Sequence, residues 1–150
     1  MKKFITEHQS PYLDLTTEAS EILYRGHSDF QDIVVADSKE FGRMLVLDGV
    51  FQTSVKDEFM YHESIVHIPL FLHPNPKRVL IIGGGDGGSA REAVRHPEVE
   101  SVAMVDIDGK VIELSKQYFP EISKAMLEEN PKLTVTVGDG IAFMRQAENY

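Results

Sequence analysis

The segment that most constrains the fold is residues 78–95, in which an apolar run, a glycine cluster and a helix-like stretch follow one another. Arg78–Ile82 is rich in Val, Ile and Leu, and it predicts a strand buried on both faces. Five of the six residues in Gly83–Gly88 are glycine, which permits positive φ angles and the close approach of a ligand to the backbone. Ser89–Arg95 then predicts a short helix. This order is typical of a Rossmann-like parallel sheet, whose ligand binds beyond the carboxyl ends of the strands.

The acidic residue inside the glycine cluster, Asp86, bears on which ligand binds there. The glycine spacing fits both the dinucleotide pattern and the looser pattern of S-adenosyl nucleoside folds. The pyrophosphate of a dinucleotide would be repelled by the Asp86 carboxylate, by roughly 1 kcal/mol in water and about 4 kcal/mol at an effective dielectric of 20. Asp86 therefore favours a cationic small molecule over NAD. The structural alternative is an aspartate that only accepts hydrogen bonds from nearby N–H groups of the loop.

Two more predicted strands end at acidic residues. Ser101–Val105 is followed by Asp106, and Leu133–Val137 is followed closely by Asp139. Asp106 stands where a Rossmann-like site binds the ribose hydroxyls, whereas Asp139 fits a helix N-cap equally well. Because right-handed crossovers bring the ends of parallel strands to one edge, we expect both carboxylates to lie on the same edge as Asp86.

The first part of the chain, residues 1–55, predicts an antiparallel β domain. Short β-rich runs cover 31–37, 43–47 and 50–54, and a looser alternation over 20–25 suggests a further strand. Asp48-Gly49 lies between two of these runs and is a strong signal for a two-residue hairpin turn.

The remaining chain is predicted to form a connecting segment, residues 56–76, and an incomplete Rossmann-like domain, residues 77–150. A helix is expected over 57–67, and Pro69 is expected to end or kink it. In the Rossmann-like part, Asp108 is expected to cap the helix that follows the second strand.

Composition excludes several classes of function. The net charge of −9 argues against a nucleic-acid partner, and no stretch is long and apolar enough to cross a bilayer. The chain has no cysteine, and His62 and His67 are five residues apart rather than the four of a helical zinc motif. We therefore expect a cytoplasmic protein without a bound metal.

In combination, these segments resemble the polyamine aminopropyltransferases, the family of spermidine synthase. The resemblance covers essentially the whole sequence, and it is carried by Phe30-Gln31, Leu47–Gln52, Asp57–Glu63, Gly83–Gly88, Val105–Asp108 and Gly138–Gly140. It implies the transfer of an aminopropyl group from decarboxylated S-adenosylmethionine, a co-substrate, to putrescine, which gives spermidine and methylthioadenosine. No permanently bound cofactor is implied. Because both substrates are cations, this chemistry suits Asp86.

The resemblance also implies a role for each site residue. Gln31 and Gln52 would contact the sugar region of the nucleoside, although exposed strand glutamines are the structural alternative. His62 and Asp86 would hold the polyamine or aminopropyl end, and Tyr61 would bond to the catalytic acid; for Tyr61 and His62 the alternative is helix packing. Asp106, where many family members carry Glu, would bind the ribose hydroxyls. The adenine would contact Asp139 and Gly140.

The proton-accepting aspartate of the family lies in an Asp-Ser-x-x-Pro type segment after a fourth strand, and no Asp or Glu in residues 1–150 matches it. We therefore expect the catalytic base beyond Tyr150 and no turnover by these 150 residues alone. Two other classes stay open, a methyltransferase and a non-catalytic module that uses the β segment for self-association. The family resemblance further implies a homodimer or homotetramer for the full-length protein.

Overall fold

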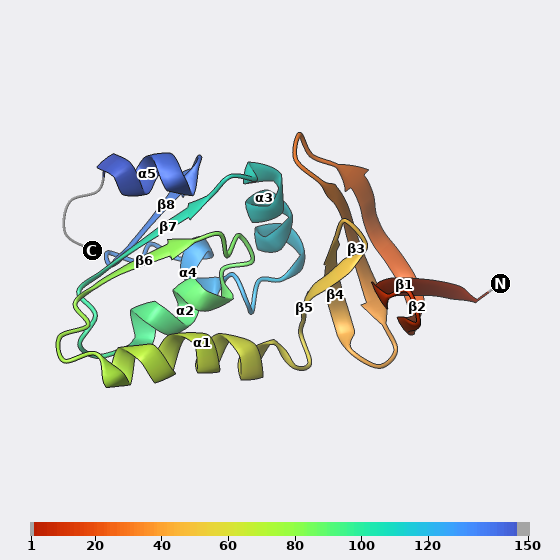
Figure 1. Cartoon of the computed structure of the whole chain (residues 1–150), viewed down its shortest axis with the longest axis horizontal. Helices are drawn as coiled ribbons and strands as arrows, with labels where there is room; N and C mark the ends of the chain where they lie inside the picture. Colours follow the sequence, from red (N-terminus) through yellow and green to blue (C-terminus); the bar gives the residue numbers. More distant parts are fainter. Residues whose placement is uncertain (1, 147–150) are drawn as a thin grey trace. The chain divides into compact units, whose positions relative to one another are not determined.

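The computed structural model describes residues 2–146 and divides the chain into two compact units, residues 1–58 and 59–150. Figure 1 draws the first unit as strands and the second as strands and helices. The fold predicted from the sequence, an antiparallel β region followed by part of a Rossmann-like parallel sheet, is confirmed.

The first unit is one antiparallel sheet with strand order β1-β2-β3-β4-β5. Its strands are β1 (Lys3–Ser10), β2 (Leu13–His27), β3 (Asp32–Ser38), β4 (Gly42–Leu47) and β5 (Val50–Ser54). Three of the predicted runs correspond to β3, β4 and β5, and the run over 20–25 is the second half of β2. The strand β1 has no clear sequence signal of its own, because its residues are mostly charged or polar.

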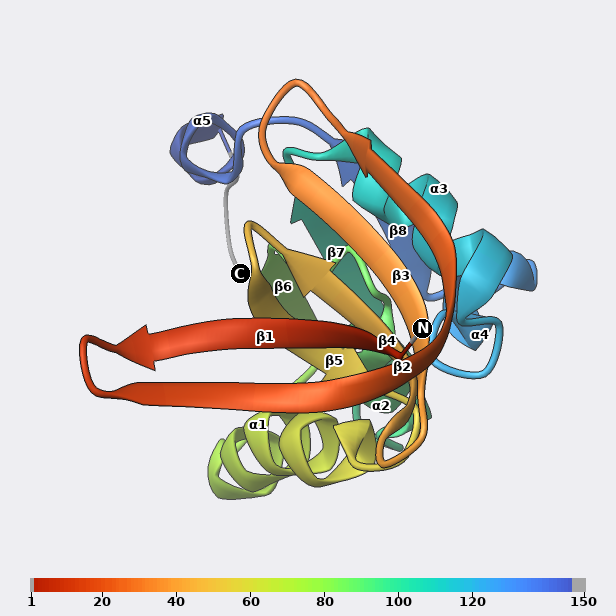
Figure 2. The same ribbon diagram turned by 90° about the vertical axis from the view of Figure 1, so that its right-hand side faces the viewer.

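The long strand β2 connects two pairings. Its residues 13–19 pair with β1, and its residues 19–27 pair with β3, with register shifts between Ala19 and Glu21 and between Ile22 and Tyr24. Figure 2 shows β1 and β2 as a long hairpin that bends into the rest of the sheet. The side chain of Glu7 on β1 accepts a hydrogen bond of 2.8 Å from the backbone N–H of Phe51 on β5. The first and last strands therefore approach each other, and the sheet curls.

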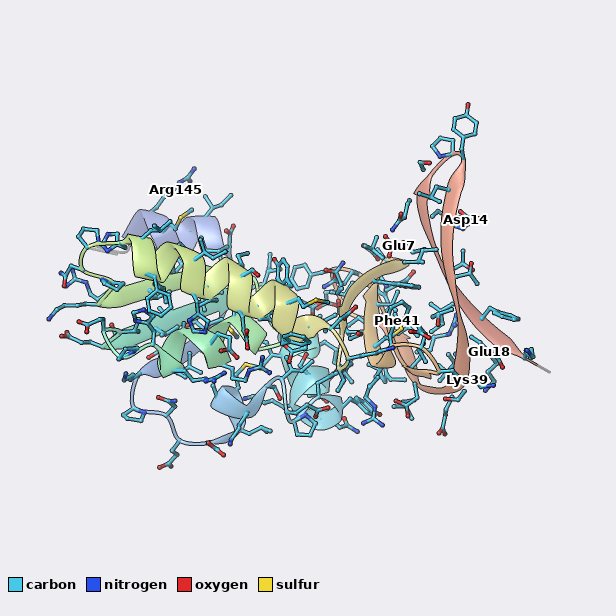
Figure 3. All side chains as sticks on the ribbon, turned by 90° about the horizontal axis from the view of Figure 1, so that it is seen from below. Glu7, Asp14, Glu18, Lys39, Phe41 and Arg145 are labelled. Carbon is cyan, nitrogen blue, oxygen red and sulfur yellow. The ribbon has the colours of Figure 1, made fainter. Side chains whose placement is uncertain are left out.

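One side of this curled sheet forms a small apolar core. It consists of Ile5, Ala19, Ala36 and Val46, against which Ile22, Val34 and Phe51 pack. At the surface, Glu18 pairs with Lys39, which follows β3, at 2.8 Å and with Lys2 at 3.1 Å. Figure 3 labels Glu18 and Lys39 next to each other. The hydrogen bonds from Lys39 and Lys2 lower the pKa of Glu18.

The predicted turn at Asp48-Gly49 is confirmed. Leu47 pairs with Val50, so the loop has two residues, and φ is 49° at Asp48 and 79° at Gly49. Two positive φ angles define a type I′ turn, whose twist matches the flanking strands. The Asp48 side chain also accepts a hydrogen bond of 2.8 Å from the N–H of Asp32, which ties the turn to β3.

The second unit is built on a parallel sheet of order β6-β7-β8. Its elements are α1 (Glu58–Leu72, with only Glu58 assigned to the first unit), β6 (Arg78–Ile82), α2 (Gly88–Arg95), β7 (Ser101–Asp106), α3 (Gly109–Tyr118), α4 (Lys124–Leu127), β8 (Leu133–Val137) and α5 (Gly140–Gln146). The three predicted strands and the helix caps at Asp108 and Asp139 are confirmed. The short helix α4 had not been predicted.

Helices α1 and α2 lie side by side, and α5 lies on the opposite side of the β6–β8 sheet from α1 (Figure 1). Val66 of α1, Ala93 of α2 and Val102 of β7 belong to one buried cluster. A second cluster joins Ala90 of α2, Met104 of β7 and Ile112 of α3. The middle strand β7 is therefore the most buried of the three, as its unbroken apolar run predicts.

The prediction that Pro69 ends the helix is wrong, because α1 continues through Pro69 to Leu72; the alternative, a kink at Pro69, stays a prediction. Pro69 lacks an N–H group and so omits one helical hydrogen bond. Its carbonyl still accepts a bond of 3.0 Å from the N–H of His73, so the last turn forms beyond it. Within residues 2–146, none of the helices combines the length and the apolar character needed to cross a membrane.

The turn at Gly49 provides a test of the first unit. Gly49→Val places a β-branched residue at a φ of 79°, and we expect it to lower the free energy of unfolding by about 1–2 kcal/mol. Gly49→Asn is the matched control, because asparagine tolerates this conformation. Urea unfolding of the three proteins measures the difference, and equal stability of the two variants would contradict the strain at this position.

Candidate functional site

The loop between β6 and α2 needs glycine for its backbone shape. Gly83, Gly84 and Gly87 have φ angles of 83°, 76° and 87°, a region that side-chain-bearing residues rarely adopt. The N–H of Gly83 donates to the Val105 carbonyl at 2.8 Å, which extends the pairing of β6 with β7. The N–H of Gly87 donates to the Gly84 carbonyl at 2.8 Å and closes a tight turn directly before α2.

Asp106, at the end of β7, supports this loop from the neighbouring strand. Its Oδ2 atom accepts a hydrogen bond of 2.8 Å from the N–H of Gly85, and its Oδ1 atom accepts one of 2.8 Å from the N–H of Asp108. A Cβ atom at Gly85 would lie 2.9 Å from Asp106 Oδ2. Gly85 is therefore required by the close approach of the carboxylate, and the carboxylate position depends on the loop.

Asp86 and His62 form a polar contact within the second unit. Asp86 Oδ1 accepts a hydrogen bond of 2.7 Å from the N–H of Gly88 and lies 3.4 Å from His62 Nε2. The His62 side chain is 2% exposed and that of Asp86 is 17% exposed. A Cβ atom at Gly88 would overlap the His62 ring. Asp86 therefore does bind a loop N–H, as the structural alternative had it, and it also faces a buried imidazole on α1.

The third acidic residue, Asp139, lies at the end of β8. Its Oδ1 atom accepts hydrogen bonds from the N–H groups of Ile141 at 2.7 Å and Ala142 at 3.2 Å, so it caps α5. The N–H of Gly138 donates to the Asp106 carbonyl at 2.9 Å. Because Asp106 bonds to Gly85 on one side and to Gly138 on the other, the ends of all three strands meet at one edge. Gly140 approaches Ile82 so closely that a Cβ atom there would overlap the Ile82 side chain.

Three further residues of the predicted site lie on other elements. Tyr61 precedes His62 on α1, is 61% exposed, and contacts the His62 ring edge-on with centroids 5.3 Å apart. Gln31 and Gln52 belong to the first unit. Gln31 is half-buried directly before β3, where its N–H donates to Ser28 Oγ at 3.1 Å, and Gln52 is exposed on β5.

Two features around the glycine loop and α2 were not predicted from the sequence. One is the segment before and within α4, where Ser123 and Met126 pack against Gly87. The other is Glu92 of α2, which bonds to His67 of α1. The only sequence signal for Glu92 is its position four residues after Gly88, on the same face of the helix.

The Glu92 carboxylate is almost fully buried, with a side-chain exposure of 1%. Burial by itself raises its pKa, but the hydrogen bonds from Arg91 and His67, together with the charges of Arg91 and Arg95, outweigh burial and hold the pKa below its usual value. Glu92 is therefore a buried anion. Within residues 2–146, no three His, Cys, Asp or Glu side chains are grouped to hold a metal ion.

Two family models together match nearly the whole chain. The family model described as "Spermine/spermidine synthase domain" matches residues 58–150, and that described as "Spermidine synthase tetramerisation domain" matches residues 3–54. The chain belongs to the spermine/spermidine synthase family. The resemblance that the sequence motifs indicated is thereby confirmed.

Individual relatives agree with this family. The chain is 48% identical over 149 residues to a polyamine aminopropyltransferase of Caldicellulosiruptor bescii, and 46% identical to polyamine aminopropyltransferase 1 of Bacillus cereus. These matches cover 99% of the chain but 53% and 54% of the relatives, so it spans about half of their length.

Solved structures show the same relationship. Spermidine synthase from Thermotoga maritima is 38% identical, with a TM-score of 0.92, over 98% of this chain and 51% of that protein. A spermidine synthase in complex with the transition-state analogue AdoDATO, also 38% identical, gives a TM-score of 0.91 over 96% of this chain and 49% of that protein.

The packing of His62 on Gly88 yields a testable expectation. Gly88→Ala should lower the free energy of unfolding by about 1–3 kcal/mol, because the His62 ring must move away from the added methyl group. In the control Gly138→Ala, the new Cβ atom would meet no heavy atom of the described residues within 4 Å, and we expect a change of no more than about 0.5 kcal/mol. Guanidinium unfolding measures both variants, and a similar loss in both would show that Gly88 has no special role.

Proposed function

We propose that the protein to which this chain belongs transfers the aminopropyl group of decarboxylated S-adenosylmethionine to putrescine, giving spermidine and methylthioadenosine. The observation that carries the proposal is the Asp86 carboxylate inside the glycine loop, 3.4 Å from the buried His62. The family membership of the chain supports the reaction class.

The charge of Asp86 provides the physical reason for the substrate. A carboxylate in the loop attracts the ammonium group of an aminopropyl chain and repels the carboxylate of ordinary S-adenosylmethionine. The backbone N–H of Gly88 donates to Asp86 Oδ1 and fixes the position of this oxygen. Asp86 and His62 would therefore hold the cationic end of the nucleoside substrate or the diamine.

Asp106 is suited to bind the ribose hydroxyls. An ionised carboxylate offers about four acceptor positions, and backbone N–H groups occupy one position on each oxygen of Asp106. Within residues 2–146, one position on each oxygen is left for a hydroxyl donor. The two structural bonds orient the carboxylate, so that a ribose diol would meet an acceptor that is already in place.

The roles of the other residues follow from the family resemblance. Gln31 and Gln52 would contact the sugar region, and Asp139 with Gly140 would contact the adenine. Asp139 caps α5 through Oδ1 only, among the bonds that the structure gives for it. Tyr61 would bond to the catalytic acid, and its side chain belongs to the exposed residues of α1.

The reaction also requires a base. The attacking amine has a pKa near 10, and its deprotonation at pH 7 costs about 4 kcal/mol. A carboxylate that holds the amine and accepts its proton lowers this barrier. The acidic residues at the strand ends are engaged with backbone N–H groups, and none of the Asp and Glu residues of the sequence matches the family's base segment. We place the base in a part of the family's chain that residues 1–150 do not contain.

Assembly and location are also part of the proposal. The match of residues 3–54 to a tetramerisation domain supports a homo-oligomer, dimer or tetramer, formed through the curled sheet of the first unit. Cytoplasmic location agrees with the soluble, cationic substrates. A methyltransferase would share the glycine loop and Asp106 but would bind a carboxylated cofactor, which Asp86 disfavours.

Ligand selectivity tests the role of Asp86. We expect the chain to bind decarboxylated S-adenosylmethionine more tightly than S-adenosylmethionine, and Asp86→Asn to remove most of this preference, because the asparagine oxygen still accepts from Gly88 but carries no charge. Calorimetry with both ligands, methylthioadenosine and NAD measures the four affinities. An unchanged ratio in the variant would contradict the electrostatic argument, and preferential binding of NAD would contradict the proposed function.

The ribose contact is tested at Asp106. Asp106→Ala should weaken methylthioadenosine binding by about 1.5–3 kcal/mol for each charge-assisted hydrogen bond lost. Asp106→Glu retains the carboxylate and should bind more tightly than the alanine variant. A methylthioadenosine analogue without ribose hydroxyls provides the second comparison. If the unmodified chain binds this analogue as well as methylthioadenosine, Asp106 does not recognise the ribose.

A further inference from the structure

Two neighbouring faces at the start of α2 contact two different segments, α1 and the residues that lead into α4. Both segments also pack against the glycine loop. Gly88 and Glu92 are four residues apart and therefore lie on one face, which meets α1: Gly88 packs under the His62 ring, and Glu92 bonds to His67. The positions directly before them, Gly87 and Arg91, form the second face.

The second face meets the segment that leads into α4. A Cβ atom at Gly87 would lie 3.0 Å from Cα of Ser123. One turn further along α2, Arg91 Nη1 donates a hydrogen bond of 3.2 Å to the Glu121 carbonyl. Both α1 and the segment before α4 therefore contact the glycine loop and also form a hydrogen bond with α2 one helical turn further on.

Glu92 is the group that connects these bonds. Its Oε1 atom accepts a hydrogen bond of 2.7 Å from Arg91 Nε, and its Oε2 atom accepts bonds from Arg95 Nη1 at 2.7 Å and His67 Nε2 at 3.1 Å. The buried carboxylate thus connects α1, through His67, with Arg91, which reaches Glu121. Neither the family comparison nor the proposed roles of the acidic residues assigns any function to this network.

We propose that Glu92 is a positioning residue: through His67 and Arg91 it holds the two segments that flank the glycine loop, and so sets the contact of His62 with Asp86. The inference rests on the proposed function, since that contact is where the cationic end of the substrate would bind. His67 lies on the same helix as His62, and a shift of α1 against α2 moves both side chains together. Glu92 does not touch the substrate.

The variants are chosen to separate positioning from general stability. Glu92→Gln keeps the size of the side chain but removes the charge and places an amide N–H₂ group opposite one of the N–H donors. His67→Leu removes the donor to Glu92, whereas His67→Gln keeps an N–H₂ group near the position of Nε2. Glu113→Gln is the control, because Glu113 pairs with Lys110 at 2.9 Å on the exposed surface of α3.

The first measurement needs no ligand. The ¹⁵N chemical shifts of the His62 imidazole report the contact of this ring with Asp86 in the folded chain. We expect them to move in Glu92→Gln and His67→Leu and to stay close to the parent values in His67→Gln and Glu113→Gln. Any other pattern overturns the proposal.

The second measurement is the ratio of the affinities for decarboxylated S-adenosylmethionine and neutral methylthioadenosine, by calorimetry. In Glu92→Gln we expect this ratio to fall by about threefold to tenfold, within the range that coupling between neighbouring groups gives, while Glu113→Gln leaves it unchanged. A purely structural role would weaken both ligands in parallel, and an unchanged ratio overturns the proposal. If the parent chain binds neither ligand, the proposed function fails, and the His62 signals alone decide whether Glu92 positions this ring.

Discussion

The arrangement of the second unit depends on the loop from Gly83 to Gly88, in which two glycines leave no space for a Cβ atom. Three of its glycines require positive φ angles, while Gly85 and Gly88 face a carboxylate and an imidazole at distances that exclude a Cβ atom. Because no side chain separates them, Asp106 reaches a backbone N–H of the loop and His62 reaches Asp86.

Backbone N–H groups position the three acidic side chains at the ends of the parallel strands. Asp86, Asp106 and Asp139 all accept hydrogen bonds from N–H groups at the ends of strands or the beginnings of helices. These bonds hold the carboxylate oxygens of several acids in position along one edge of the sheet. Their combined charge suits a cationic nucleoside and a diamine, which is the substrate chemistry that we propose for this member of the spermine/spermidine synthase family.

Much of the local structure could be predicted from the sequence. The bounds of β6 and the caps at Asp108 and Asp139 follow from patterns within a few residues, as does the turn at Asp48-Gly49. The strand β1 escaped prediction because it lies at the edge of the sheet and its side chains are mostly polar. The continuation of α1 past Pro69 also escaped prediction, because the loss of one helical hydrogen bond is compensated by packing that a local pattern does not record.

The sequence by itself determined the glycine loop and the acids after the strands, on which the proposed site rests, since these are local signals tied to the period of each element. Only the tertiary structure decided which groups meet. His67 and Glu92 lie 25 residues apart on different helices, and the contact of His62 with Asp86 also joins α1 to the loop before α2. The physical reason is that periodicity identifies the buried face of a helix but not the partner that this face meets, because the partner is selected by the packing of both helices on the sheet.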